Sequence, residues 1–155
     1  MASSTNKKID LDAAMPLIRE QVAAGGTVEF YPRGISMLPM LRQGKDTVTL
    51  SAPPKKLKKY DLPLYVRDDG HYVLHRVVKV GETYSCIGDN QFETEHGVRH
   101  DQIIAVAIAF AREGKRISTS NFKYRFYCSF WHNSRGVRRL WRKIIFKLKN
   151  ITSKD

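Results

Sequence analysis

The stretch Tyr72-Val73-Leu74-His75-Arg76-Val77-Val78-Lys79-Val80 decides the fold class of this chain. It is dominated by β-branched and aromatic residues, which favour strands. Because side chains alternate along a strand, His75 and Arg76 are predicted to lie on opposite faces of a sheet. The chain is therefore predicted to be mainly β. Runs of similar composition occur at Thr27–Tyr31, Thr47–Ser51, Leu64–Arg67, Thr83–Ile87 and Ile103–Ala109.

Helical patterns flank this β region on both sides. From Asp10 to Gly26, apolar residues recur at helical spacing, and a glycine pair can end the helix. From Val137 to Lys149, apolar residues line one face and Lys or Arg occupies the rest, which predicts a basic amphipathic helix. We therefore expect an N-terminal segment and helix (residues 1–26), a β domain (27–118) and a basic, aromatic tail (119–155).

The composition fits a folded domain with an appendage. The 155 residues are 42% hydrophobic and 27% charged, which is typical of soluble globular proteins. Of the net charge of +12, residues 112–155 contribute +11, from 13 Lys/Arg against 2 Asp/Glu. Cys86 and Cys128 form neither a disulfide framework nor a metal-binding spacing. Neither a signal peptide nor an apolar run of ~20 residues is found. We expect a cytoplasmic protein without a metal or cofactor.

The segment Gly34-Ile35-Ser36-Met37-Leu38-Pro39 is a candidate nucleophile turn. Gly34 permits backbone conformations that other residues resist, and Pro39 stiffens the exit of the turn. A serine hydroxyl held there needs a nearby base, and the oxyanion that forms needs hydrogen-bond donors. Met37 would supply an apolar wall for a substrate side chain. The simpler alternative is that Ser36 caps a short helix that follows it.

His75 is the candidate general base, although a single histidine on a strand is more often structural. A neutral imidazole can take the proton of Ser36 and return it to the leaving amine. Lys79, on the same predicted face, is the competing base. Asp89 and Glu95 both follow His75 and either could orient its ring. Asp89 also suits a turn, so the residues leave the choice between the two acids open.

Taken together, these segments resemble the motifs of the signal peptidase/LexA-like serine peptidases. Ser36-Met37-Leu38-Pro39 is similar to the Ser-Met-x-Pro box of that family, and Gly88-Asp89-Asn90 to its Gly-Asp-Asn box. His75-Arg76-Val77 resembles the branch that uses histidine where bacterial leader peptidases use lysine. The resemblance implies a β-barrel-type peptidase domain. It also implies a serine endopeptidase that cleaves a peptide or leader segment through an acyl-enzyme at Ser36, with His75 as base.

The resemblance also suggests roles for the surrounding residues. It implies that Asp89 and Glu95 belong to the catalytic site, and that Gly34, Met37 and Pro39 lie at the substrate and oxyanion positions. Gly34 stands where family members often carry a serine that donates to the oxyanion, so backbone amides would have to suffice. One residue, Lys45, interrupts the Arg-Gly-Asp element that normally follows the serine box.

Two other functions fit the sequence. A self-cleaving, repressor-type member of the same family would cut its own Ala24–Gly25 bond. Only 12 residues separate Ala24 from Ser36, however, and the single predicted helix offers no helix-turn-helix. The other alternative is a non-catalytic binding module that works through its basic tail.

The tail itself allows three interpretations. Lysines and arginines around an apolar face, with tryptophan nearby, are typical of helices that lie in a membrane interface. An anionic membrane surface is therefore the first expected partner, at the inner face of the cell membrane. Packing on the β domain comes second and nucleic-acid binding third. The residues expected to contact the membrane or another polyanion are Arg138, Arg139, Trp141, Arg142 and Lys143.

Overall fold

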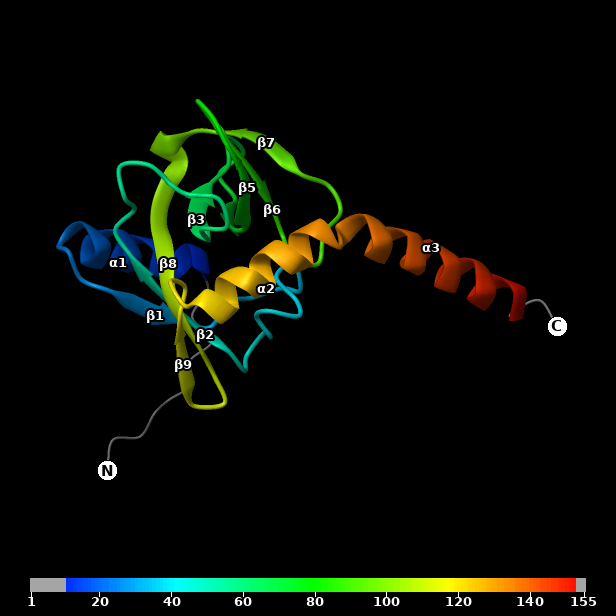
Figure 1. The fold of residues 1–155 in the computed structure, drawn as a ribbon. Coiled ribbons are helices and arrows are strands. Elements are labelled where there is room, and N and C mark those ends of the chain that lie inside the picture. The colour runs from blue at the N-terminus through cyan, green and yellow to red at the C-terminus, as the bar shows by residue number, and fades with distance from the viewer. Residues whose placement is uncertain (1–10, 153–155) are drawn as a thin grey trace.

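The computed structural model describes residues 11–152, which form a β body with flanking helices and one projecting helix (Figure 1). The helices are α1 (Leu11–Ala23), α2 (Phe122–Asn133) and α3 (Arg135–Thr152). The strands are β1 (Val28–Phe30), β2 (Thr47–Ser51), β3 (Pro63–Val66), β4 (Tyr72–Leu74), β5 (Arg76–Val80), β6 (Tyr84–Ile87), β7 (Glu95–Val98), β8 (Ile103–Arg112) and β9 (Lys115–Ser118). A short 3₁₀ helix, His100–Gln102, precedes β8.

The strands form two antiparallel sheets. The larger sheet has the order β1-β2-β8-β3-β4, with β9 also paired to β8, and the smaller has the order β5-β6-β7. β8 is central because it is long enough to pair with three neighbours. Ala105 lies opposite Leu64 of β3, and Phe110 lies opposite both Val48 of β2 and Ile117 of β9. Of these residues, Val48, Leu64 and Ala105 have no exposed surface.

Two helices complete the main core. Helix α1 buries Met15, Ile18 and Val22 against the larger sheet, and α2 buries Tyr124 and Cys128 in the same cluster. These spacings of three or four residues place each set on one face of its helix. A second core of nine buried residues lies at the smaller sheet and also draws on β3, β4 and β8. The apolar face of α1 is therefore as predicted, whereas α2 was not predicted as a helix.

The chain crosses from the larger sheet to the smaller one at His75. The predicted strand 72–80 consists of two strands, β4 paired to β3 and β5 paired to β6. His75 lies between them. Val73 and Val77, which alternation places on the same face as His75, both belong to the second core. A register shift between Val77 and Lys79 then turns Lys79 out to solvent.

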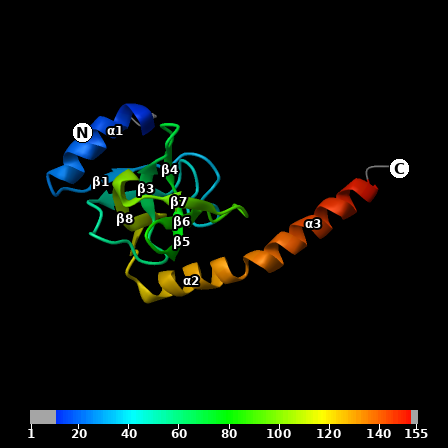
Figure 2. The ribbon, with the colours of Figure 1, turned by 90° about the horizontal axis from the view of Figure 1, so that it is seen from above.

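The mainly β prediction is confirmed, together with the N-terminal and C-terminal helices. The barrel-type prediction is not matched, because neither described sheet closes on itself. The hydrogen-bonded ladder of the larger sheet ends at β4 and does not continue into β5. The tail helix extends beyond its predicted bounds at both ends and points away from the body (Figure 2). No helix among residues 11–152 is long and apolar enough to cross a bilayer.

Candidate functional site

Ser36 lies half-buried in a tight turn between β1 and β2. Gly34 has a φ of +82°, a conformation that favours glycine, so it directs the chain into the turn. The Gly34 amide donates a hydrogen bond to Gln43 Oε1 at 2.9 Å. The amides of Ser36 and Met37 have no such partner among residues 11–152, so both could donate to an oxyanion. In this part of the chain Ser36 is followed by further turns and not by the short helix that the capping alternative required.

The corner Gly88-Asp89-Asn90 supports the Ser36 turn from behind. The Asn90 amide donates to the Ser36 carbonyl at 2.8 Å, and Asn90 Nδ2 donates to the Ile35 carbonyl at 3.1 Å. The contact is so close that a Cβ atom at Gly88 would lie 2.6 Å from the Ser36 carbonyl oxygen. Gly88 is therefore required for a close approach of two backbone segments, which fixes the carbonyl of the candidate nucleophile.

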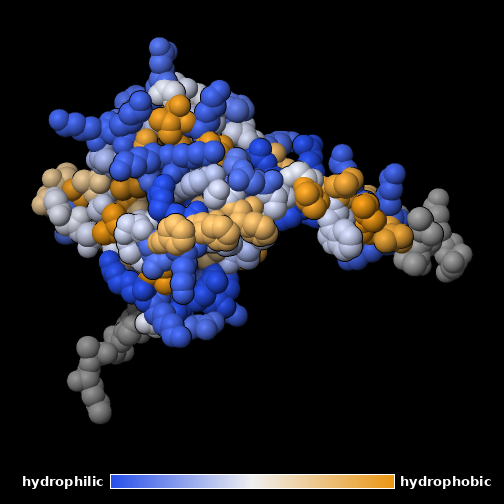
Figure 3. Space-filling view, in the orientation of Figure 1, coloured by the Kyte–Doolittle hydropathy of each residue, from blue (hydrophilic) through white to orange (hydrophobic). Residues whose placement is uncertain are grey.

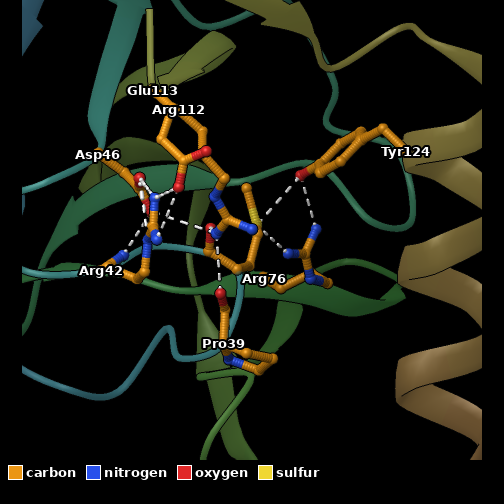
Figure 4. A network of polar contacts seen from close by, with 8 residues as sticks. Pro39, Arg42, Asp46, Arg76, Arg112, Glu113 and Tyr124 are labelled. Carbon is orange, nitrogen blue, oxygen red and sulfur yellow. Dashed lines mark hydrogen bonds and ion pairs between the residues drawn. The ribbon is translucent and has the colours of Figure 1, made fainter. Parts of the chain in front are cut away.

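A buried ionic network holds the other end of the same turn. Asp46 is fully buried and pairs with Arg42 at 2.8 Å and with Arg112 at 3.1 Å (Figure 4). Arg112 also donates to the carbonyls of Pro39 and Met40, which end the turn. Burial alone would raise the pKa of Asp46, but hydrogen bonds from Arg42 and Arg112 lower that pKa to about 2. The Arg42-Gln43-Gly44-Lys45-Asp46 element thus anchors the turn despite the extra lysine.

His75 is buried at the crossing between the two sheets, with 4% of its surface exposed. Its ring meets the ring of Tyr65 edge-on, with centroids 6.4 Å apart. Its Nδ1 atom is buried and has no hydrogen-bond partner. Burial, with a smaller contribution from the nearby Arg67 guanidinium, lowers the pKa of His75 to about 4. The imidazole is therefore neutral at physiological pH and able to accept a proton.

Ser36 and His75 line one hollow of about 320 Å³, whose walls also include Met37 and Gly34. His75 lines a second, larger hollow of about 660 Å³, which is formed mainly by residues 91–95. Arg67 and His75 line both hollows, so the imidazole lies where the two hollows adjoin. No hydrogen bond joins the side chains of Ser36 and His75 in the described chain. Such bonds often tighten only when substrate is bound.

Asp89 has a different partner from the one expected. Both of its carboxylate oxygens accept hydrogen bonds from Arg76, each at 2.7 Å, and both side chains are 2% exposed. Arg76 further donates to Tyr124 Oη at 2.9 Å, on the side of the strand away from His75. Asp89 lines neither hollow. Its position suits the tethering of the Ser36 corner to the strand that follows His75, and not direct contact with the imidazole.

Glu95 lines a hollow together with His75, but its carboxylate is already hydrogen-bonded to other residues. It accepts hydrogen bonds from Arg67 at 2.9 and 2.7 Å and from the Tyr65 hydroxyl at 2.7 Å. Burial alone would raise the pKa of Glu95, but these bonds lower it overall. Glu95 lines the larger hollow with His75, and its charge raises the pKa of His75. It therefore acts on the imidazole through space, without touching Nδ1.

A second serine and histidine lie in direct contact elsewhere. Ser85 Oγ is 2.9 Å from Nδ1 of His96, on the neighbouring strands β6 and β7. Ser85 is buried in the middle of a strand and lines neither hollow. Ser85 lies within strand β6, whereas Ser36 lies in a turn. This pair fits a structural role, and it is the natural comparison for any test of Ser36.

The remaining predicted site residues are distributed unevenly. Met37 lines the smaller hollow, whereas Pro39 is exposed and lines neither one. The sequence missed Arg67 and Gln91, which line both hollows. Arg67 ends a predicted strand beside the Asp68-Asp69-Gly70 turn, where nothing in the sequence distinguishes it from an ordinary surface arginine. Among residues 11–152, no group of three or more His, Cys, Asp or Glu is placed to hold a metal ion.

The tail residues divide into two groups. Arg138 stacks on the Trp131 ring at 3.8 Å and donates to the Asp89 carbonyl at 3.5 Å, and the Arg142 guanidinium lies 5.0 Å from the Phe92 ring. Arg139, Trp141 and Lys143 are exposed. The first turns of α3 thus contact the 89–92 segment, which includes the wall of the larger hollow.

Comparison with protein-family models, with curated proteins and with solved structures found no match to this chain.

Proposed function

We propose that this protein is a serine endopeptidase of the signal peptidase/LexA-like type, with Ser36 as nucleophile and His75 as general base. The observation that carries the proposal is the shared hollow. Ser36 and His75 come from segments 39 residues apart in sequence, yet both line it, and the imidazole there is neutral. We also propose that the β domain is related in fold to the signal peptidase/LexA-like peptidases, and the support for this is the same pair, Ser36 and His75.

The chemistry would run as follows. Nε2 of His75 takes the Ser36 proton while Oγ attacks the scissile carbonyl, and the amides of Ser36 and Met37 stabilise the oxyanion. The C–N bond then breaks, and the imidazolium gives its proton to the leaving amine. Water, activated by the same imidazole, hydrolyses the acyl-enzyme. Because Nδ1 of His75 is unpartnered, this is a dyad, and the imidazolium lacks the carboxylate that stabilises it in a triad.

The substrate would be a peptide or leader segment that lies across the two hollows, without cofactor or metal. We place this activity in the cytoplasm, including the inner face of the cell membrane. Two features support that location. Cys86 and Cys128 are both buried free thiols, as is usual in a reducing compartment. The basic tail is suited to contact with anionic lipid.

The alternatives are less well supported. Self-cleavage at Ala24–Gly25 would need that bond in the hollow, but neither residue lines it. Gly25, with a φ of +78°, ends α1, and its amide donates to the Val22 carbonyl at 3.0 Å. The glycine pair thus has a structural role as a helix terminus. A non-catalytic binding module would keep the same hollow without a reactive serine, which the following experiment would reveal.

A phosphonate or β-lactam probe that acylates or phosphonylates active serines tests the proposal, with the adduct located by mass spectrometry. We expect labelling at Ser36 that is lost in Ser36→Ala and falls by about 100-fold or more in His75→Gln. Labelling should stay constant down to about pH 5 and fall to half near pH 4, because the pKa of His75 is about 4. An unperturbed imidazole would instead lose activity near pH 6.5.

Ser85→Ala is the matched control, because Ser85 is the serine that already contacts a histidine. It should leave labelling unchanged. An adduct on Ser85, or equal labelling of wild type and Ser36→Ala, would contradict the assignment of the nucleophile. Absence of any adduct on folded protein would favour the binding module.

A further inference from the structure

Helices α2 and α3 follow one another along the chain and form one rod that bends at their junction. A single residue, Ser134, separates them, and its backbone remains in the right-handed helical region. The Ser134 amide donates to the Phe130 carbonyl at 2.9 Å, and the Arg138 amide donates to the Ser134 carbonyl at 3.0 Å. Both bonds join residues four apart, so the helical register passes through the junction. Figures 1 and 2 show α3 following directly from α2, bending at the junction and leaving the body.

An apolar stripe follows this rod from end to end. Phe122, Phe126 and Phe130 are four residues apart on α2, and their exposed fractions are 82%, 65% and 62%. With the register maintained, five apolar residues of α3 continue on the same side. Figure 3 shows the hydrophobic side chains of α2 and α3 on the same face of the molecule. The apolar stripe thus comprises Phe122, Phe126, Phe130, Val137, Leu140, Trp141, Ile144 and Leu148, over about 40 Å at 1.5 Å per residue.

Positive charge surrounds the stripe. Helix α3 contains seven Lys or Arg residues and no acidic residue. The lysine-rich loop 55–59 lies against α2, where Arg125 donates to the Lys59 carbonyl at 2.9 Å. The apolar stripe and the cations around it therefore complement a partner whose surface is anionic and whose interior is apolar.

We propose that the apolar stripe binds the surface of an anionic membrane, with α2 and α3 lying in the plane of the interface. Exposed phenylalanine, leucine and tryptophan can enter the boundary between headgroups and acyl chains, while Lys and Arg meet the lipid phosphates. Nucleic acid would use the cations but would leave the aliphatic residues in water. A second copy of this chain would cover the stripe but would bring two strongly basic helices together.

The rod also touches the wall of the candidate site. Trp131 Nε1 donates to the Asp89 carbonyl at 2.8 Å, and Arg135 donates to Thr94 Oγ1 at 3.3 Å. Thr94 lines the larger hollow beside His75. If the stripe lies on lipid, the hollow is held at a fixed place close to the membrane. This consequence rests on the proposed peptidase function, and it suits a substrate peptide that is itself held at the membrane.

Vesicle co-sedimentation of the full chain tests the membrane proposal without reference to activity. We expect binding to vesicles of phosphatidylcholine with phosphatidylglycerol to be at least about tenfold tighter than to phosphatidylcholine alone, and to weaken with salt. Leu140→Glu should weaken binding to the anionic vesicles by about tenfold or more, because it places a carboxylate in the stripe. Phe126→Glu should also weaken binding, because the stripe includes α2.

Phe146→Glu is the matched control. Phe146 is 66% exposed and Leu140 is 60% exposed, both on α3, but Phe146 lies on the basic side of the helix. Both substitutions replace an apolar residue by one negative charge, so a difference between them reports the stripe and not net charge. Phe146→Glu should change binding by less than about threefold. Circular dichroism of each variant would confirm that the helices are retained.

Four results would overturn the proposal. Equal binding to both kinds of vesicle, or equal losses in Leu140→Glu and Phe146→Glu, would show that the stripe does not direct membrane binding. A stable dimer that Leu140→Glu dissociates, without vesicle binding by the wild type, would identify a second copy as the occupant. Tight binding to an oligonucleotide that Leu140→Glu leaves intact, again without vesicle binding, would identify nucleic acid. Ser36→Ala should bind vesicles like the wild type, so failure of the peptidase proposal would remain distinguishable.

Discussion

His75 and Arg76 are neighbours in sequence and both are buried, at 4% and 1% exposure, but their surroundings differ in every other respect. The Arg76 guanidinium is paired with Asp89 and bonded to Tyr124 Oη, and its pKa is raised well above the ordinary value. The Nδ1 atom of His75 has no partner, and its pKa is lowered to about 4. Arg76 is thus a charge with hydrogen-bond partners, and its neighbour His75 is a neutral base whose Nδ1 has none.

This difference separates a structural role from a reactive one. A buried charge with full hydrogen bonding ties segments together and is destabilising to disturb. A buried titratable group that lines a hollow and lacks partners is a candidate for function. The same dipeptide serves both purposes, because at the crossing from β4 to β5 the His75 ring meets Tyr65 of the second core while Arg76 bonds to Tyr124 of the main core.

Disrupting the ion pair between Arg76 and Asp89 should give the largest loss of stability. Arg76→Met leaves Asp89 buried without its cation, so we expect a loss of about 3–5 kcal/mol in the free energy of unfolding. Urea denaturation followed by circular dichroism would measure it. The double variant Arg76→Met/Asp89→Leu should recover part of the loss, because no unpaired charge remains. If the single variant were as stable as wild type, the pair would not be the tether that we describe.

The buried, neutral imidazole of His75 predicts that the stability of the fold depends on pH. The pKa of His75 in the folded protein, about 4, lies below the ordinary 6.5, so only the unfolded chain takes up the proton between these values. Stability should therefore be complete above about pH 6.5 and should fall by roughly 3 kcal/mol as the pH drops to 4. Urea denaturation across that range would detect it. His75→Leu should flatten this part of the profile. A profile identical to wild type would show that His75 is not buried neutral.

The close contact between Gly88 and Ser36 gives a smaller effect on stability. Gly88→Ala places a methyl group 2.6 Å from the Ser36 carbonyl oxygen, so we expect about 1–3 kcal/mol of destabilisation. Probe labelling at Ser36 should fall as well, because the turn must shift. Gly81→Ala is the control, since its Cβ would lie 3.5 Å from the nearest atom, the Thr83 carbonyl oxygen. Equal behaviour of the two variants would remove the proposed role of the Gly88 corner.

The smallest expected effect is a shift in the pKa of His75 when the neighbouring ion pair between Arg67 and Glu95 is disrupted. Arg67 lowers the pKa of His75 and Glu95 raises it. Arg67→Met should therefore raise that pKa, and Glu95→Gln should lower it. An NMR titration of the His75 ring protons would follow both shifts. Shifts of the same sign in the two variants would contradict the through-space account of this site.

The sequence predicted the elements whose periodicity is simple. The strands around Val48, Leu64 and Ala105 alternate or run apolar, and the Ser36 turn follows from Gly34 and the residues around it. Helix α2 was missed because both of its faces are aromatic: Tyr124 points into the core while Phe126 is exposed. Without a polar face, no amphipathic pattern marks the helix. The edge strand β7 was missed because its four residues include a glycine and two polar side chains.

The site was predicted in part for a similar reason. Ser36 and His75 were identified from short sequence motifs, and both line one hollow. The partner of Asp89 was not found, although the predicted alternation already placed Arg76 on the opposite face from His75. Asp89 pairs with Arg76 through both carboxylate oxygens and lines neither hollow that His75 lines. Arg67 was missed because its role depends on how two sheets meet, which no local pattern records.

The close packing of Gly88 on Ser36 has a practical meaning for protein engineering. The segments that carry these two residues cannot be exchanged separately, because each shapes the space that the other occupies. A chimera that transplants the Ser36 loop into another scaffold would also have to carry the 88–90 corner. In a directed-evolution library, we expect tolerated changes near either residue to arise together with changes near the other.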